Sequence, residues 1–292
     1  TRALEIKENL VITNRGNITA NNIVVATHYP IMNAPGYYFM KMHQERSYII
    51  ALENADNVNG MYIDVEKNGC SFRNYKDLLL LGAIDQRTGE NEKGGCYDKL
   101  RKIAKDLYPN SKEKYHWSAQ DCMTIDKIPY IGKYSDKTPN IYVATGFNKL
   151  GMTSSMVSAM IISDMILDKE NDFSEIFSPK RFDLLLSIGN IANDMIETAK
   201  NFIAQKIYIP SSKIEHIKNG HAGIVEYNDE KIGVYKNNDG KEFIVSTKCP
   251  HLGCQLGWNA DELTWDCPCH GSRFDYKGRL IGSPATKDLI DN

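Results

Sequence analysis

The sequence has no excess of charge of either sign and no long uninterrupted apolar run. Its 35 lysines and arginines nearly balance its 37 aspartates and glutamates, for a formal net charge of -2. This balance offers no basic stripe for a phosphate backbone, so we expect no nucleic acid among the partners. The most apolar stretch, residues 152–167, is interrupted by serines and an aspartate, and it falls short of the uncharged run that a membrane-spanning helix needs. We expect no transmembrane anchor in this chain.

Targeting signals are also lacking. The first ten residues, TRALEIKENL, have neither the apolar core nor the small-residue cleavage site of a signal peptide. Three of the seven cysteines, Cys70, Cys96 and Cys122, are scattered along the chain. This distribution is typical of buried free thiols in a reducing compartment. We therefore expect a cytoplasmic protein, or one that is peripheral to the membrane.

Nucleotide-binding glycine signatures are absent from residues 1 to 180. Neither G-x-G-x-x-G nor G-x-x-x-x-G-K followed by Ser or Thr occurs there. What the sequence does have is enough length for two cores, because 292 residues exceed the usual size of a single compact domain. Its hydrophobic content of 42% and charged content of 25% are ordinary for globular proteins.

The order of local patterns predicts an α+β first domain over residues 1–180. Short β-type runs precede one helix, and a buried strand, a glycine turn and a second helix follow it. The predicted strands are 10–13, 22–27, 46–52, 61–65, 78–83 and 140–145, and the predicted helices are 97–107 and 153–167. A further helical pattern predicts a helical linker over 181–205. From 206 to 292, short strands and turn signals such as Asn219-Gly220 predict a small all-β domain.

The strongest chemical signal lies in the second domain. Residues 249–272 read CPHLGCQLGWNADELTWDCPCHGS, which contains C-x-H, then 15 intervening residues, then C-x-x-H. Each loop offers one thiolate and one imidazole, Cys249 with His251 and Cys267 with His270. Two cysteines on one iron and two histidines on the other hold a [2Fe–2S] cluster of raised potential. We expect such a cluster here, and hence one-electron transfer.

Two alternatives stand beside this interpretation. Two cysteines and two histidines also satisfy tetrahedral zinc, although zinc fingers group the cysteines together and the histidines together, whereas this sequence interleaves them. Cys254 and Cys269 follow the two cysteine ligands and would face one another across the loops, which makes them disulfide candidates. Their alternative is a pair of free thiols in a reducing cytosol.

The motif CPHLGC…WDCPCHGSRF, with GSPA at 282–285, closely resembles Rieske proteins of the disulfide-bearing kind found in cytochrome bc complexes, over residues 206–292. The resemblance implies that Ser272 hydrogen-bonds a cluster sulfide and that Leu252 and the loop at Pro284 shield the cluster. It also shows a departure: where that family often has a tyrosine whose hydroxyl bonds a ligand sulfur, this chain has Phe274. We therefore expect a lower potential than in those complexes.

The first domain is interpreted from a second resemblance. The stretches GNITANNIVVATHYP, WSAQDCMTIDKIPYIG and NIYVATGFNKLGMTSS look like the later part of a flavoprotein of the D-amino-acid, glycine and sarcosine oxidase-like family. That family binds FAD and oxidises amines or amino acids, but its N-terminal βαβ unit with the glycine fingerprint has no counterpart here. The resemblance makes Gly146, Gly151 and Thr153 flavin candidates. From the residues alone, a tight turn between strand and helix, which needs glycine for backbone reasons, is the favoured explanation.

Two functions follow as hypotheses. In the first, a flavin oxidises an amine-like or amino-acid-like small molecule and the cluster passes the electrons to an unknown acceptor. In the second, the chain is a Rieske electron carrier or docking module without flavin chemistry of its own. Arg46 and Arg73 lie beside β-type runs and could clamp a substrate carboxylate, although most arginines at strand ends are only solvated. No catalytic residue is assigned.

Overall fold

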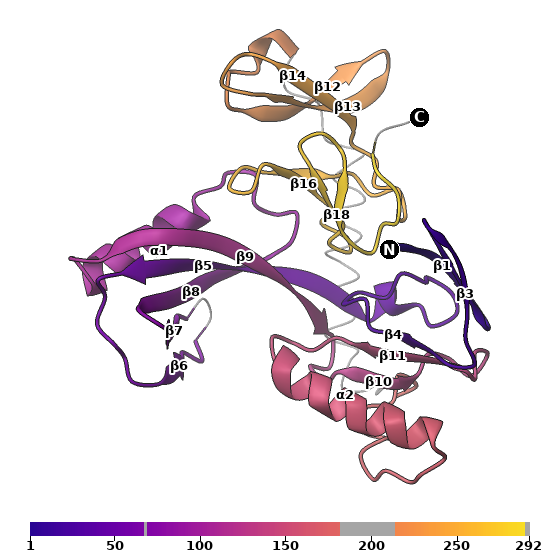
Figure 1. Cartoon of the computed structure of the whole chain (residues 1–292). Coiled ribbons are helices and arrows are strands. Elements are labelled where there is room, and N and C mark those ends of the chain that lie inside the picture. Colours follow the sequence, from indigo (N-terminus) through magenta and orange to yellow (C-terminus); the bar gives the residue numbers. More distant parts are fainter. Residues whose placement is uncertain (67–68, 182–213, 290–292) are drawn as a thin grey trace.

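The computed structural model describes residues 1–66, 69–181 and 214–289. The first part contains three sheets and two α-helices, and the C-terminal part is built from short strands (Figure 1). Among the described residues, no helix has the length and apolar character needed to cross a membrane. The predicted fold class, an α+β part followed by an all-β part, is confirmed.

Two small sheets contain the first four strands of the chain together with β10 and β11. One is an antiparallel meander, and the other pairs β4 in parallel with β11, which is antiparallel to β10. Their strands are β1 (Ala3–Lys7), β2 (Leu10–Thr13), β3 (Gly16–Thr19), β4 (Ile23–Val25), β10 (Tyr130–Lys133) and β11 (Ile141–Thr145). Four buried tyrosines, Tyr29, Tyr38, Tyr130 and Tyr134, fill the core between these sheets and the short 3-10 helix η1 (Tyr38–Met40).

A five-stranded antiparallel sheet forms the centre of the first part, in the order β6-β7-β8-β5-β9. Its strands are β5 (Met42–Glu53), β6 (Met61–Ile63), β7 (Ser71–Tyr75), β8 (Leu78–Arg87) and β9 (Lys112–Thr124). Side chains alternate along β5, so every second residue from Met42 to Ile50 is buried on one face. Helix α1 (Cys96–Leu107) covers that face, where Leu100 packs in one core with Tyr48 and Ile50.

After β11 the chain makes the turn 146–150 and enters α2 (Gly151–Ile166). The helix packs on β10 and β11 through Ile161 and Ile162, which share a buried cluster with Ile131 and Tyr142. The predicted unit of strand, glycine turn and helix is therefore confirmed.

The C-terminal part contains two antiparallel sheets after the 3-10 helix η2 (Ile214–His216). Their strands are β12 (Ala222–Tyr227), β13 (Glu230–Lys236), β14 (Glu242–Ser246), β15 (Gly257–Asn259), β16 (Thr264–Asp266), β17 (Arg273–Asp275) and β18 (Leu280–Gly282). The fully buried Trp265 joins the sheets, because its indole lies directly over Gly233, where an added Cβ would come within 2.7 Å of the ring.

The C-terminal part lies on the same face of the central sheet as α1 (Figure 1). Gln44, Arg46 and Tyr48, successive inward residues of β5, all contact it: Gln44 bonds to His270, Arg46 pairs with Glu262, and the Tyr48 hydroxyl is near Asn259. One face of a single strand thus supports both the helix and the second part.

Every strand and both helices predicted for the first part are present; β2 has the predicted ends, and the other elements differ at one end or both. The longest strand, β9, was not predicted, because its sequence KEKYHWSAQDCMT mixes charged and aromatic residues and much of it is exposed. β1, β3, β7 and β10 were not predicted either. The helical linker predicted over 181–205 lies outside the described residues from 182 onward.

Candidate functional site

Two loops with the same backbone conformation form the centre of the C-terminal part. In each, a glycine with positive φ donates to the carbonyl of a cysteine four residues earlier: Gly253 to Cys249 and Gly271 to Cys267, both at 2.9 Å. Each cysteine N–H in turn donates at 2.8 Å to the carbonyl of the residue five positions later. Glycine is needed at both turns because their φ values of +79° and +80° are unfavourable for residues with a Cβ.

These loops bring the four predicted ligands together. Cys249 and Cys267 are buried, and their thiols are in hydrogen-bonding contact. The rings of His251 and His270 lie edge to face, with centroids 4.9 Å apart and planes at 89°. Both Nδ1 atoms are buried and have no hydrogen-bond partner among the described residues. Since buried polar atoms are normally partnered, two such atoms without partners fit the role of ligands to a bound group.

The protonation states favour metal binding. Burial lowers the pKa of His251 to about 4 and that of His270 to about 3. The hydrogen bond from Cys267 lowers the pKa of Cys249 to about 7, and the same contact together with burial raises the pKa of Cys267. Neutral imidazoles and a readily ionised thiol are the forms that coordinate iron.

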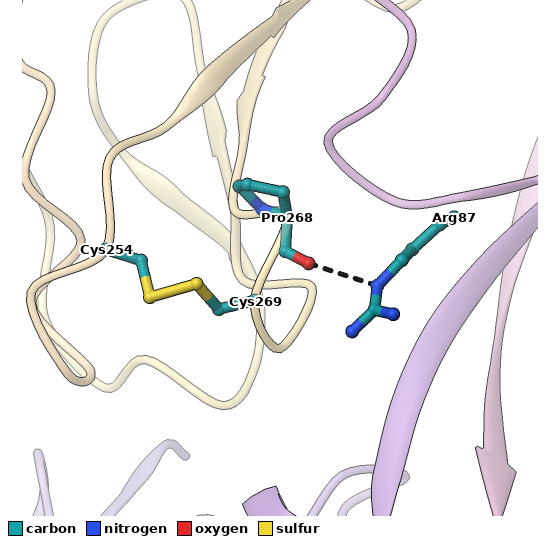
Figure 2. Close-up of a disulfide and its surroundings, with 4 residues drawn as sticks. All are labelled: Arg87, Cys254, Pro268 and Cys269. Carbon is teal, nitrogen blue, oxygen red and sulfur yellow. Dashed lines mark hydrogen bonds between the residues drawn. A yellow bond between two sulfur atoms is a disulfide. The ribbon is translucent and has the colours of Figure 1, made fainter. Parts of the chain in front are cut away.

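Cys254 and Cys269 form a disulfide that joins the two loops, with an S–S distance of 2.15 Å (Figure 2). The free-thiol alternative is therefore wrong for this pair. The sulfur of Cys267 lies within 4.8 Å of both disulfide sulfurs. That group of three is a poor metal site, because two of its sulfurs are already bonded to each other.

Ser272 lies where its hydroxyl can act on a ligand. Its Oγ accepts a 3.0 Å hydrogen bond from the backbone of Ala285, and its hydroxyl bonds the Cys249 thiol. The same GSPA loop carries Pro284, next to Ala285. Leu252, next to His251, is 41% exposed, so it covers the end of the loop only in part.

The first part of the chain contacts both histidines from outside. The Oδ1 atom of Asn33 lies 2.6 Å from His251 Nε2. The ring of Phe39, in η1, meets the His270 ring edge on, with 5.8 Å between centroids. These contacts were not predicted, and no local signal could reveal them, because Asn33 and His251 are 218 positions apart.

Two glutamines of the central sheet hold the backbone of the second loop. Gln44 Nε2 donates to the His270 carbonyl at 2.6 Å, and Gln120 Nε2 donates to the Gly271 carbonyl at 2.8 Å. Nearby, Arg87 Nε donates to the Pro268 carbonyl at 3.3 Å (Figure 2). The cluster loops therefore rest on the first part of the chain instead of projecting into solvent.

Of the three flavin candidates, Gly146 lies in the turn before α2, and Gly151 and Thr153 lie in the first turn of the helix. An added Cβ at Gly146 would lie 2.2 Å from Thr124 Cγ2, so packing alone requires glycine there. Gly151 has no heavy atom within 4 Å of such a Cβ, and packing gives no reason for glycine. Thr153 is exposed and its Oγ1 donates to the Leu150 carbonyl. The N-cap residue of α2, Leu150, makes no side-chain capping hydrogen bond within the described part of the chain.

A pocket of about 590 Å³ opens beside this turn. It lies between α2 and the strands β4 and β11, and its lining includes Val24, His28, Gly146 and Ile162. Its volume is within the range of pockets that bind cofactors and small molecules.

Neither arginine weighed as a carboxylate clamp is placed for that role. Arg46 is buried between the two parts of the chain, where its guanidinium bonds Gln120 and lies 3.5 Å from Glu262. Arg73 is exposed on β7.

Comparison with known proteins agrees with this geometry. A family model described as FAD dependent oxidoreductase matches residues 1–165 of the 292, and a model described as Rieske [2Fe-2S] domain matches residues 208–291. The chain belongs to the FAD dependent oxidoreductase family. Its C-terminal part is a Rieske domain, and the two families imply FAD and a [2Fe–2S] cluster as cofactors.

Relatives share both parts or one of them. The Rieske 2Fe-2S iron-sulfur protein YhfW of Bacillus subtilis is 36% identical over 99% of this chain. The chain spans 59% of the length of YhfW. The cytochrome b6-f complex iron-sulfur subunit of Synechococcus elongatus is 30% identical over 34% of this chain and 50% of its own length. Glycine oxidase from Geobacillus kaustophilus has a similar fold over 62% of this chain and 52% of its own, with a TM-score of 0.53 at 20% identity.

Proposed function

We propose that this chain belongs to an FAD-dependent oxidoreductase that oxidises an amine-like or amino-acid-like small molecule and sends the electrons through its own Rieske cluster to an acceptor still to be identified. The observation that carries the proposal is the docking of both cluster loops onto the flavoprotein part, through Asn33, Gln44 and Gln120. A fixed docking of this kind favours electron transfer within one chain.

The proposed iron ligands are the sulfurs of Cys249 and Cys267 on one iron and the Nδ1 atoms of His251 and His270 on the other. The two unpartnered Nδ1 atoms fit this assignment. When bound, FAD would take two electrons from the substrate and the cluster would carry them onward singly. The protein's contribution is to hold four ligands in one geometry, to exclude water, and to donate the Ser272 hydroxyl to a ligand sulfur.

For the flavin we propose a site at Gly146 and at the start of α2, with Gly151 and Thr153, beside the pocket of about 590 Å³. The uncapped N–H groups at the start of α2 would donate to the flavin or its pyrophosphate. We also propose a cytoplasmic location, in keeping with the three free thiols Cys70, Cys96 and Cys122.

The test is a visible spectrum of the purified chain before and after dithionite, with iron and flavin quantified. Cluster bands together with flavin bands, and loss of cluster colour when an amine or amino acid is added without oxygen, would support the enzyme. Cluster bands alone, with no response to any amine, would favour the alternative of an electron carrier or docking module. A colourless protein that contains zinc would overturn the cluster assignment.

The ligand set is tested separately. His270→Cys should keep two irons per chain but lower the midpoint potential, because a thiolate brings more negative charge than an imidazole. The matched control is His221→Cys, at an exposed histidine of the same domain. Equal potentials in the two variants would contradict ligation by His270.

A further inference from the structure

We propose that Asn33, a residue of the flavoprotein part, is a positioning residue for the cluster: its side-chain oxygen fixes the orientation of His251 and lowers the midpoint potential. This inference rests on the ligand set of the proposed function. It adds to that function a contact between the two domains that sets a property of the cluster from outside the Rieske fold.

The geometry of one hydrogen bond carries the first step. Asn33 Oδ1 and His251 Nε2 are 2.6 Å apart. An amide oxygen can only accept, so His251 donates and Nε2 carries the proton. The other ring nitrogen, Nδ1, is then left with a free lone pair, and it is the buried atom without a partner among the described residues. Asn33 thus selects the nitrogen that faces the cluster.

The second step is that the two domains fit tightly together beside this contact. Gln44 and Gln120 bond each other as well as the carbonyls of the second loop. An added Cβ at Gly271 would lie 2.7 Å from Gln44 Cβ, and one at Gly89 would lie 2.5 Å from the backbone nitrogen of Pro268. At each of these close contacts, a glycine of one domain leaves room for an atom of the other domain: Gly271 for Gln44, and Gly89 for Pro268.

The third step gives the sign of the effect. An acceptor on Nε2 increases the electron density of the imidazole and so makes it a more basic ligand. A more basic ligand stabilises the oxidised cluster relative to the reduced one, which lowers the potential. Removing the acceptor should raise the potential, and replacing it with a carboxylate should lower the potential further. Asn33 is only half-buried, so its substitution need not unfold the chain.

The experiment measures the midpoint potential of the full chain at one fixed pH, with iron and sulfide content and the EPR spectrum recorded for each variant. Asn33→Leu should shift the potential to a more positive value and Asn33→Asp to a more negative one, with two irons per chain in both. The matched control is Asn91→Leu, which removes hydrogen bonds to Asn259 and Asp261 at the same interface but away from the histidines.

Opposite shifts for the two Asn33 variants, with no shift for Asn91→Leu, would support the inference. An unchanged potential in Asn33→Leu, or an equal shift in Asn91→Leu, would overturn it while leaving the ligand set intact. A wild-type chain with no [2Fe–2S] EPR signal after reduction would instead refute the ligand set of the proposed function, and the inference with it.

Discussion

The Asp261 carboxylate accepts a 2.9 Å hydrogen bond from the backbone N–H of Cys96, the first residue of helix α1. Its other oxygen accepts from Gly95, also at 2.9 Å. Asp261 belongs to the turn between β15 and β16 of the Rieske domain, whereas α1 belongs to the flavoprotein part. A helix of one domain is thus capped by a carboxylate of the other, since Gly95 itself has no side chain that could do so.

Loss of this cap should loosen the interface. We expect Asp261→Ala to lower the free energy of unfolding by about 1 kcal/mol, the usual cost of a lost N-cap, and to make α1 exchange its amide hydrogens faster. Urea unfolding and hydrogen exchange measure the two effects. Asp106→Ala, an exposed substitution at the other end of α1, is the control. Equal changes in both variants would show that Asp261 does not act as a cap.

The pH dependence of stability should depend in part on Glu45. The hydrogen bond from His43 lowers the pKa of Glu45 to about 2, with further lowering by the Lys149 ammonium at 3.2 Å and against the effect of burial. Because the folded-state pKa lies below the ordinary value of 4.5, the stabilisation is present above pH 4.5 and is lost as the pH falls towards 2.

Glu45→Gln should therefore cost on the order of 1 kcal/mol at pH 7, and the difference from wild type should shrink between pH 5 and pH 3. Urea unfolding at three pH values gives the curve. Glu8→Gln, at an exposed turn residue, should run parallel to wild type throughout. A difference for Glu45→Gln that is constant with pH would refute the low pKa.

The sequence was sufficient to predict the cluster loops, because all four proposed ligands lie between positions 249 and 270 and the chemistry of the pair of loops is local. The disulfide was predictable for the same reason. The contacts from Asn33, Gln44 and Asp261 were not, since each joins residues more than 160 positions apart. Polar residues in loops and strands form no sequence pattern from which their contact partners could be identified.

The flavin side shows a different limit. Gly146, Gly151 and Thr153 were singled out by resemblance, and they lie in the turn before α2 and in the first turn of that helix. Their residue types do not distinguish a cofactor site from a turn that requires glycine for its backbone conformation. Only at Gly146 does packing explain why glycine is present. Arg46 shows the opposite case. Its positive charge suggested that it binds a substrate carboxylate. Because side chains alternate along β5, however, Arg46 points into the interface between the two parts, where it pairs with Glu262.

The disulfide should stabilise the loops that hold the cluster. The bridge closes 15 positions of chain, for which the entropic model gives about 3 kcal/mol. The double variant Cys254→Ser/Cys269→Ser should lose about that much stability and bleach faster in air, as absorbance over time would record. Serine is chosen so that no new thiol competes beside Cys267. Cys70→Ser, at a free cysteine of the first part, should bleach at the wild-type rate.

The Ser272 hydroxyl should raise the cluster potential. It bonds the sulfur of Cys249, and a donor to a ligand sulfur stabilises the more negative, reduced cluster. Ser272→Ala should lower the midpoint potential by about 60 mV, which corresponds to about 1.4 kcal/mol for one electron. Ser174→Ala, at a partly exposed serine of the first part, is the control. If both variants had the wild-type potential, the hydroxyl would have no part in tuning the cluster.

Phe274 should be the position where the potential can be raised. The ring is fully buried in the same core as Cys249 and Cys267, and the resemblance to Rieske proteins of cytochrome bc complexes implies a tyrosine at this position whose hydroxyl would bond a ligand sulfur. We expect Phe274→Tyr to add that donor and raise the midpoint potential by about 60 mV, opposite in sign to Ser272→Ala. A hydroxyl without a partner would leave the potential unchanged and cost about 1–3 kcal/mol of stability instead, because it would be buried and unpaired. Measuring potential and urea unfolding on the same variant separates these outcomes, and Phe173→Tyr, at an exposed phenylalanine, should change neither.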